Sequence, residues 1–116
     1  MKISPRLRGA ITNRSLTTIA YWTPQEIYVL DVLTGRPKKL FSLHDFFDFI
    51  VSVHWIKQDT GLFIATARGK IFLSDLEGES TLLRDYGKRV LYATRIDNEV
   101  YLAVSSHNIV NIKVYH

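Results

Sequence analysis

The stretch LFIATA at residues 62–67, followed by the turn residues Arg68 and Gly69 and by IFLSD at residues 71–75, sets the pattern of the whole chain. Both runs are short and apolar, and a glycine-containing turn separates them, which is the signature of a β-hairpin. Both alternating sets of positions are apolar, as in strands whose two faces are covered. This stretch therefore predicts paired strands with packing on both sides.

The same two runs recur along the chain. LTTIAYW at residues 16–22 and VYLAVS at residues 100–105 resemble the first run, 46 residues before it and 38 residues after it. IYVLD at residues 27–31 and IVNIK at residues 109–113 resemble the second run, 44 residues before it and 38 residues after it. The two series keep step, so the sequence contains a repeat of about 40 residues, a length typical of stacked or circular repeat architectures.

Turn residues and short apolar runs predict eleven strands in one domain, residues 1–116, with no segment of helical period. The three units are expected at about residues 8–43, 50–84 and 90–115. The expected strands lie near 8–12, 16–22, 27–32, 39–43, 50–57, 62–67, 71–76, 80–84, 90–96, 100–105 and 109–115.

Composition narrows the class of protein. With 116 residues and 47% hydrophobic residues, the chain is long enough for one core and too apolar for a disordered segment. Cysteine is absent from the sequence, which excludes disulfides and thiolate metal sites. The basic start lacks an apolar run and no run could span a bilayer, so we expect an intracellular protein, cytoplasmic or nuclear, without a signal peptide or membrane segment.

The second unit resembles a WD40 repeat. In that family a Gly-His pair precedes the first strand of a unit and a Trp-Asp pair closes the third. Here Leu43-His44 stands at the first position, and Leu30-Asp31 and Ser74-Asp75 stand at the second. The glycine and both tryptophans of those pairs are absent, and the third unit has Lys113 at the equivalent place. The resemblance spans roughly residues 8–115 and implies β-propeller blades.

We therefore predict an all-β fold of about eleven antiparallel strands in three four-stranded, propeller-like blades, the third of them one strand short. The alternative is a compact β-barrel or sandwich. A closed propeller typically has four to eight blades, so the ring is expected to be incomplete. Exposed strand edges and uncovered apolar faces favour association. We expect either a second copy or a protein partner to complete the propeller.

The aromatic stretch from Phe41 to Phe49 connects the first two units. Buried positions are the default for large apolar side chains, so two or three of the four phenylalanines are expected to pack between blades. The alternative is an exposed contact site for a protein, since aromatic anchors dominate interfaces. The candidate partner-binding residues are Phe46, Phe47, Phe49 and Trp22.

Several polar residues have a structural interpretation. Asp31 and Asp75 recur at one position of the repeat, where Asx-type hydrogen bonds would hold the turns at Gly35 and Gly78. His44 is expected to form a hydrogen bond within its own blade. His44, Asp45, Asp48 and His54 include ligand types that suit zinc or iron, but no spacing fixes them together, so no metal or other cofactor is predicted.

The formal net charge of +4 comes from small basic groups. Two of these basic groups are expected in connections next to outer strands. If the two connections share one rim of the blades, both groups would contact phosphates there. The two groups consist of Arg36, Lys38 and Lys39, and of Lys88 and Arg89. Nucleic-acid binding within a ribonucleoprotein is therefore an alternative function. A propeller lectin is a further alternative, since Trp22, Trp55 and six tyrosines would stack on sugars if exposed.

Motifs of enzymes are absent from the sequence, including phosphate-binding loops, dinucleotide fingerprints, His-Glu-x-x-His and Gly-x-Ser-x-Gly. The sequence favours a non-catalytic protein–protein interaction module that acts as a scaffold or as a subunit of a larger assembly. Stacked blades are rigid and present loops on two opposite faces, which suits that role.

Overall fold

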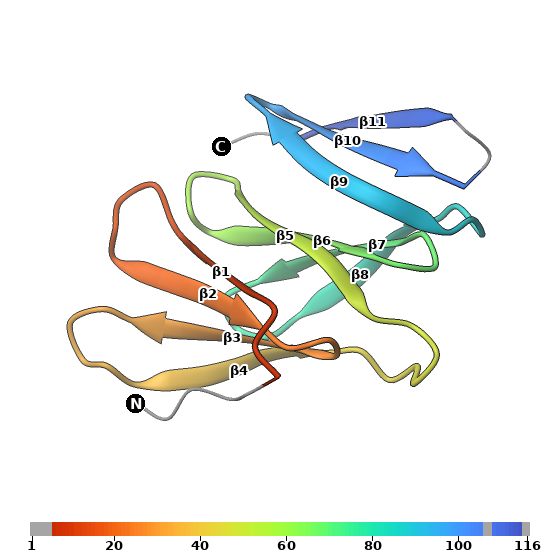
Figure 1. Ribbon diagram of the computed structural model, residues 1–116. Helices are drawn as coiled ribbons and strands as arrows, with labels where there is room; N and C mark the ends of the chain where they lie inside the picture. The colour runs from red at the N-terminus through yellow and green to blue at the C-terminus, as the bar shows by residue number, and fades with distance from the viewer. Residues whose placement is uncertain (1–5, 106–107, 115–116) are drawn as a thin grey trace.

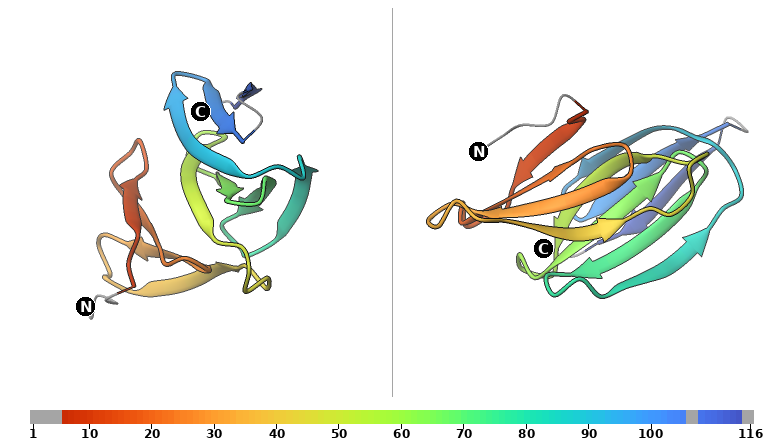
Figure 2. Two further views of the ribbon diagram at one scale, coloured as in Figure 1. Left: turned by 45° about the vertical axis from the view of Figure 1, so that its right-hand side comes forward. Right: turned by 90° about the horizontal axis from the view of Figure 1, so that it is seen from below.

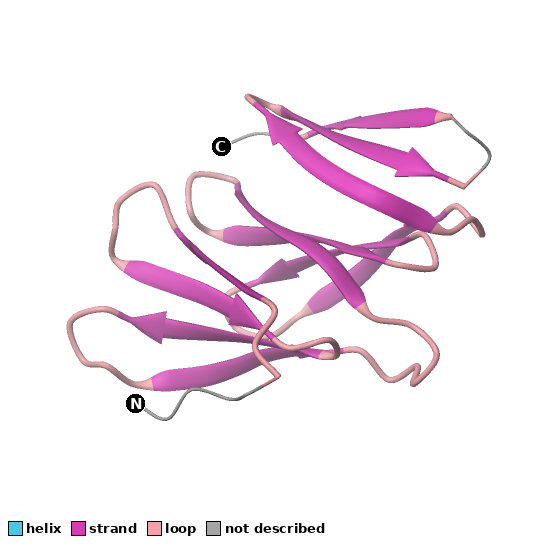
Figure 3. Cartoon of the chain, in the orientation of Figure 1, coloured by secondary structure: helices cyan, strands magenta, loops and turns pink. Residues whose placement is uncertain are grey.

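The computed structural model describes residues 6–105 and 108–114, and that part of the chain consists of strands and loops without a helix (Figure 3). In this described part of the chain, eleven strands form three antiparallel sheets in which consecutive strands pair (Figure 1). We call these sheets blades 1, 2 and 3. Within the described residues, no helix is present that is long and apolar enough to cross a membrane.

The strand boundaries follow the pattern expected from the sequence. Blade 1 contains β1 (Gly9–Thr12), β2 (Thr18–Trp22), β3 (Glu26–Asp31) and β4 (Pro37–Ser42). Blade 2 contains β5 (Ile50–Ile56), β6 (Gly61–Thr66), β7 (Lys70–Asp75) and β8 (Ser80–Asp85). Blade 3 contains β9 (Val90–Ile96), β10 (Glu99–Val104) and β11 (Ile109–Lys113). The expectation of eleven antiparallel strands is confirmed.

The three blades pack face to face and follow one another along an arc that does not close (Figure 2). This arrangement confirms the incomplete propeller and shows that the alternative of a barrel or sandwich is wrong. Blade 3 has three strands in the described residues, with β11 at its edge.

Strand β6 explains why the central stretch is apolar on both sides. Leu62 and Ile64 belong to the core between blades 1 and 2, whereas Phe63 and Ala65 belong to the core between blades 2 and 3. All four side chains are completely buried. Burying a large apolar side chain contributes roughly 1.5–3 kcal/mol, so this strand stabilises both contacts between blades.

The two cores recruit side chains from every blade. The first core adds Ala20, Ile27, Val29, Leu40, Phe41, Leu43, Ile50, Val53 and Trp55. The second core adds Ile56, Ile71, Val90, Val100, Leu102, Val104 and Val114. By contrast, each residue of the outer strand β8 is exposed. Burial is therefore concentrated between the blades.

One boundary in blade 1 differs from the expectation and moves two basic residues. Lys38 and Lys39 were predicted in a connection that leads into a strand near residues 39–43, but both lie within β4, which begins at Pro37. Proline lacks a backbone N–H and is tolerated at the first residue of an outer strand, so the strand starts there and not near residue 39.

Candidate functional site: the loop face and its groove

Every second connection lies at the same end of the blades, on the right-hand side of Figure 1. Backbone hydrogen bonds join these connections in turn. Ile50 N–H donates to the oxygen of Pro24 at 2.7 Å, and Ala67 N–H donates to the oxygen of Phe49 at 2.8 Å. Val90 N–H donates to the oxygen of Ala67 at 2.7 Å. We call this surface, residues 23–25, 43–49, 67–69 and 86–89, the loop face.

Buried polar contacts hold the longest of these connections. Gln25 Nε2 donates to the backbone oxygens of Asp45 at 3.2 Å and Asp48 at 3.4 Å. Asp48 is 1% exposed, and its Oδ1 accepts hydrogen bonds from the N–H groups of Phe49 and Arg68, both at 2.9 Å. Charge-assisted bonds of this kind are stronger than neutral ones. The connection therefore has a defined shape.

The phenylalanines divide between core and surface. Phe41 is buried, and its ring meets that of Phe72 edge-on at 5.0 Å. Phe46 and Phe47 are 86% and 84% exposed, and Phe49 is 47% exposed. Of the four, Phe41 alone is buried, so the expectation that two or three of them pack between blades is wrong. Polar contacts hold the connection outside the cores between blades, which leaves the rings of Phe46 and Phe47 exposed.

The two tryptophans have restricted access. Trp55 is 5% exposed, and its Nε1 donates to the backbone oxygen of Ile11 at 3.0 Å. Trp22 is half-buried, with its ring so close to Gly9 that a Cβ atom there would lie 2.3 Å from it. The exposed stacking platforms required by the lectin alternative are therefore not provided by either tryptophan.

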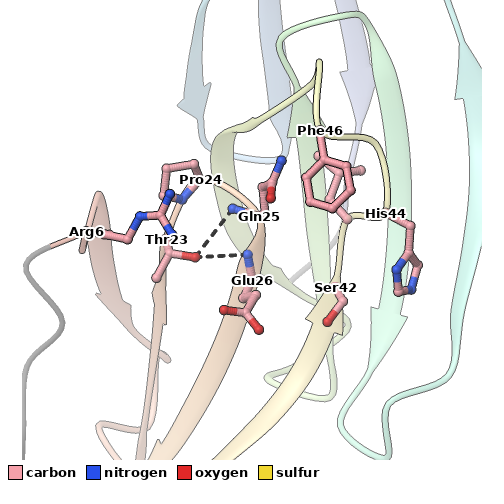
Figure 4. A pocket seen from close by; sticks show the side chains of 9 residues that line it. Arg6, Thr23, Pro24, Gln25, Glu26, Ser42, His44 and Phe46 are labelled. Carbon is pink, nitrogen blue, oxygen red and sulfur yellow. Dashed lines mark hydrogen bonds between the residues drawn. The ribbon is translucent and has the colours of Figure 1, made fainter.

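Three adjoining pockets, of about 280, 430 and 420 Å³, form one groove on the loop face, and Pro24 lines all three. In the first pocket, Arg6 and Phe46 approach from opposite sides (Figure 4). There Thr23 Oγ1 accepts the N–H groups of Gln25 at 3.4 Å and Glu26 at 3.1 Å. We call this feature the loop-face groove. Its third pocket is lined by Arg8, Trp22, Pro24, Phe49, Ile50, Val51, Arg89, Val90 and Leu91.

The carboxylates around the groove are engaged within the protein. Glu26 pairs with Lys39 at 2.9 Å, and the hydrogen bond from that ammonium lowers the pKa of the Glu26 carboxyl. Asp45 lies 4.0 Å from the guanidinium of Arg68 and also accepts the N–H of Phe47. Asp48 lines the second pocket, and its buried carboxylate accepts two backbone N–H groups. The arginines that line the groove are Arg6, Arg8 and Arg89.

The predicted phosphate-contacting residues do not share one rim. Arg36 lies in the β3–β4 connection, at the end of the blades where Lys38 Nζ donates to the backbone oxygen of Leu76 at 3.1 Å. Lys88 and Arg89 lie in the β8–β9 connection, on the loop face. Successive connections of a meander alternate between its two ends, so the two groups lie at opposite ends of the blades.

The repeated aspartates bind the turns that follow them. Asp31 Oδ1 accepts the N–H groups of Leu33 and Thr34 at 2.8 and 3.1 Å. Asp75 Oδ1 accepts the N–H groups of Glu77 and Glu79, both at 2.9 Å. The turns continue to Gly35 and Gly78, whose φ angles of 68° and 96° favour glycine.

His44 and His54 differ in their burial. His44 is exposed and lines the groove, and within residues 6–105 and 108–114 its imidazole forms no hydrogen bond, contrary to the expected bond inside its blade. Gln25 makes the ties that hold this connection instead. His54 is buried against Phe63 of blade 2, with the ring centroids 6.0 Å apart. In the described part of the chain, no cluster of three metal-ligating side chains is present.

Sequence reasoning did not assign Arg6, Arg8, Pro24 or Gln25 to a site. The available signal was the alternation of the connections. Because a meander returns its chain to the same end after every second strand, the segments before β1, between β2 and β3, and between β4 and β5 belong together. Assigning every second connection to the same end of the blades would have placed these four residues near Phe46.

Neither a protein-family model nor a curated protein sequence matches the chain. Solved structures do. The WD40 domain of SCAP from fission yeast is 13% identical over 98% of this chain, with a TM-score of 0.67. The N-terminal domain of Nup159 is 10% identical over 97%, with a TM-score of 0.70. A chain of the mitotic checkpoint complex is 17% identical over 83%, with a TM-score of 0.66.

These similarities show the fold: the chain folds as WD40-like β-propeller repeats, three blades in an open arc. It spans 28–31% of the length of the three solved chains. The absence of the glycine and the tryptophans of those pairs does not prevent this fold, because the cores between blades are built from the apolar strand positions.

Proposed function

We propose that the protein is a non-catalytic protein–protein interaction module, a partial propeller that acts as a scaffold or subunit of a larger assembly. The observation that carries this proposal is that both end blades have one covered face and one uncovered face. In a closed propeller, each of these faces packs against a neighbouring blade.

The uncovered face of blade 1 is aromatic at its centre. Tyr21 and Tyr28 are paired across β2 and β3, and their rings stack with centroids 5.4 Å apart. They are half-buried, while Ala20 and Val29, which alternate with them, belong to the core against blade 2. The stack is therefore on the side of the sheet away from blade 2.

The uncovered face of blade 3 is more exposed. Tyr92, Ile96 and Ile109 are 64%, 61% and 66% exposed. Val100 and Leu102 of the same sheet are completely buried against blade 2. Large apolar side chains gathered on one face of a sheet are typical of interaction sites. Further blades, from a second copy or from another protein, would cover both end faces.

Phe46 and Phe47 supply a second contact surface for this module. Phe46 lines the groove, as do Phe49 and Trp22. Aromatic side chains are frequent anchors of interfaces, and a connection whose backbone is already ordered has little backbone entropy to lose when a partner binds. Replacing both Phe46 and Phe47 with Ser is expected to weaken partner binding and to leave the melting temperature nearly unchanged, because neither ring is packed.

The proposal is tested by measuring the native mass of the chain at micromolar concentration and of the tagged protein recovered from its own cells. The chain mass is 13.4 kDa, so self-association gives multiples of that value and a foreign partner gives a different increment. Tyr92→Lys with Ile96→Lys should abolish the complex. Leu33→Lys is the matched control, since Leu33 is 93% exposed in the β3–β4 turn and lies off both end faces. A monomer in both preparations would contradict the proposal.

A further inference from the structure

We infer that the inner end of the loop-face groove binds an acidic segment of a protein partner, with a carboxylate received by Arg8 and Arg89 and an apolar side chain seated beside Trp22 and Phe49. This inference rests on the proposed interaction function and names the chemistry of the partner.

The position of the pocket is set by the first strands of all three blades. Arg8 immediately precedes β1, Ile50 and Val51 begin β5, and Val90 and Leu91 begin β9. The pocket has a volume of about 420 Å³, and most of its lining residues are apolar. A volume of this size fits a side chain or two of a peptide, and it falls within the range of known ligand pockets.

The charge of the pocket is uncompensated in the described chain. Within residues 6–105 and 108–114, neither the Arg8 nor the Arg89 side chain has an ion-pair or hydrogen-bond partner. None of the described residues that line the pocket is acidic. In the adjoining pocket, which Arg8 also lines, Asp48 is buried and accepts the N–H groups of Phe49 and Arg68. Farther along the groove, Glu26 pairs with Lys39 and Asp45 with Arg68. Two guanidinium groups beside an apolar floor suit a carboxylate, which they bind with paired, directional hydrogen bonds.

A peptide segment fits these features better than a nucleic acid does. Among the described residues, only Arg8 and Arg89 line this pocket as cations without an intramolecular partner. Tight nucleic-acid binding usually neutralises many more phosphates than two cations could. Arg36 and Lys38 lie at the opposite end of the blades and cannot join the same contact. The neighbouring pocket adds the 86% exposed ring of Phe46, which offers a further apolar contact along an extended segment.

The experiment measures binding of two synthetic peptides by fluorescence anisotropy. The acidic peptide alternates Asp or Glu with Phe and Leu over nine residues. The amide peptide has the same sequence with Asn in place of each Asp and Gln in place of each Glu. We expect the acidic peptide to bind at least tenfold more tightly than the amide peptide. Arg8→Gln and Arg89→Gln should each weaken the acidic peptide about tenfold and leave the amide peptide unchanged.

Arg36→Gln is the matched control, because it removes the same charge from an exposed arginine at the other end of the blades. Equal weakening by Arg36→Gln would overturn the inference, since binding would then depend on net charge alone. Equal binding of the two peptides, absence of binding, or tighter binding of a single-stranded RNA of the same net charge would each overturn it as well.

The result separates this inference from the proposed function. The native mass of the assembly depends on the end faces, and we expect it to be unchanged by Arg8→Gln and Arg89→Gln. An assembly that forms while the acidic peptide fails to bind would remove the groove inference and leave the interaction module intact. If a chain that remains monomeric binds the peptide, the proposal that further blades complete the propeller would be rejected instead.

Discussion

Trp55 of β5 donates a hydrogen bond from its indole Nε1 to the backbone oxygen of Ile11 in β1, at 3.0 Å. The bond joins the first strands of blades 1 and 2, and the ring itself is 5% exposed in the core between them. Aromatic packing and a directional bond to the neighbouring backbone together set the position of one blade relative to the next.

Replacing Trp55 with Phe should lower the free energy of unfolding by about 1–3 kcal/mol, because the packing partly remains while a buried acceptor loses its donor. Trp55→Ala should lower it by about 3–5 kcal/mol, since it also leaves a cavity. Urea unfolding followed by circular dichroism measures both. If Trp55→Phe and Trp55→Ala cost the same, the hydrogen bond rather than the packed ring would account for the stability.

Much of the fold was predictable because the strands are specified by local pattern. LFIATA at residues 62–67 is apolar at every position except Thr66, which requires cover on both faces, and the structure buries all six residues. The repeated apolar runs likewise located six of the eleven described strands, and turn residues with other short apolar runs located the rest. The boundary at Pro37 was not predictable from apolarity, because the first half of β4 is exposed and carries Lys38 and Lys39.

The candidate site was less predictable because it depends on how the connections converge. Phe46 and Phe47 have the composition of core residues, and only the ties from Gln25 and Asp48 show that their connection lies outside the core. The relation between Arg8 and Arg89 arises from three blades meeting, across 81 positions of sequence. No local pattern carries that information.

A second contact between blades involves Asp59, which follows Lys57 and Gln58 in a turn where all three residues have positive φ angles of 53–67°. Its carboxylate accepts bonds from Arg14 N–H, Ser15 N–H and Ser15 Oγ at 3.0, 3.0 and 2.7 Å. Such backbone conformations are costly for residues other than glycine and persist where contacts compensate for them. The turn is therefore held by its bonds to blade 1.

Asp59→Ala should lower the free energy of unfolding by about 1–2 kcal/mol at pH 7, since three accepted hydrogen bonds are lost at an exposed site. Burial raises the pKa of the Asp59 carboxyl, but bonds from Ser15 and Arg14 outweigh it and lower the pKa below 3.8. The stabilisation is thus present above the unfolded value and is lost as pH falls through the folded one. Chemical denaturation at several pH values should show the difference from wild type shrinking below about pH 4.

His54 makes the contact between blades 2 and 3 sensitive to acid. Burial and the nearby Arg95 guanidinium lower the pKa of the imidazole from 6.5 to about 4. Arg95 itself donates from Nη1 to the backbone oxygen of Trp55, which keeps its charge close to this strand. Protonation of His54 would therefore place a second, poorly hydrated cation between the blades.

Because the folded pKa of His54 is lowered, the unfolded state binds a proton first as pH falls. Stability should be complete above about pH 6.5 and should decline by roughly 3 kcal/mol towards pH 4. In His54→Leu this decline should largely disappear, whereas His44→Gln, at an exposed histidine, should retain it. Unfolding free energies measured from pH 7.5 to pH 4 provide the comparison, and an equal slope in wild type and His54→Leu would refute the assignment.

Alanine substitutions at Gly69 and Gly35 distinguish the effect of a steric clash on the loop face from the effect of backbone strain. Both have positive φ angles, of 93° and 68°. A Cβ atom at Gly69 would lie 2.4 Å from the backbone oxygen of Lys88, whereas one at Gly35 would meet nothing within 4 Å. Alanine at Gly35 therefore adds only the left-handed strain, of roughly 1–2 kcal/mol. Alanine at Gly69 adds that strain and also forces the β8–β9 connection away.

We expect Gly35→Ala to lower the melting temperature by a few degrees and Gly69→Ala to lower it by about twice as much or more. Because Lys88 is followed directly by Arg89, displacement of this connection should also weaken the acidic peptide in the Gly69→Ala protein at a temperature where it is still folded. Differential scanning calorimetry and the anisotropy assay measure the two effects. Equal melting temperatures for the two variants would show that the β6–β7 and β8–β9 connections are not in close contact.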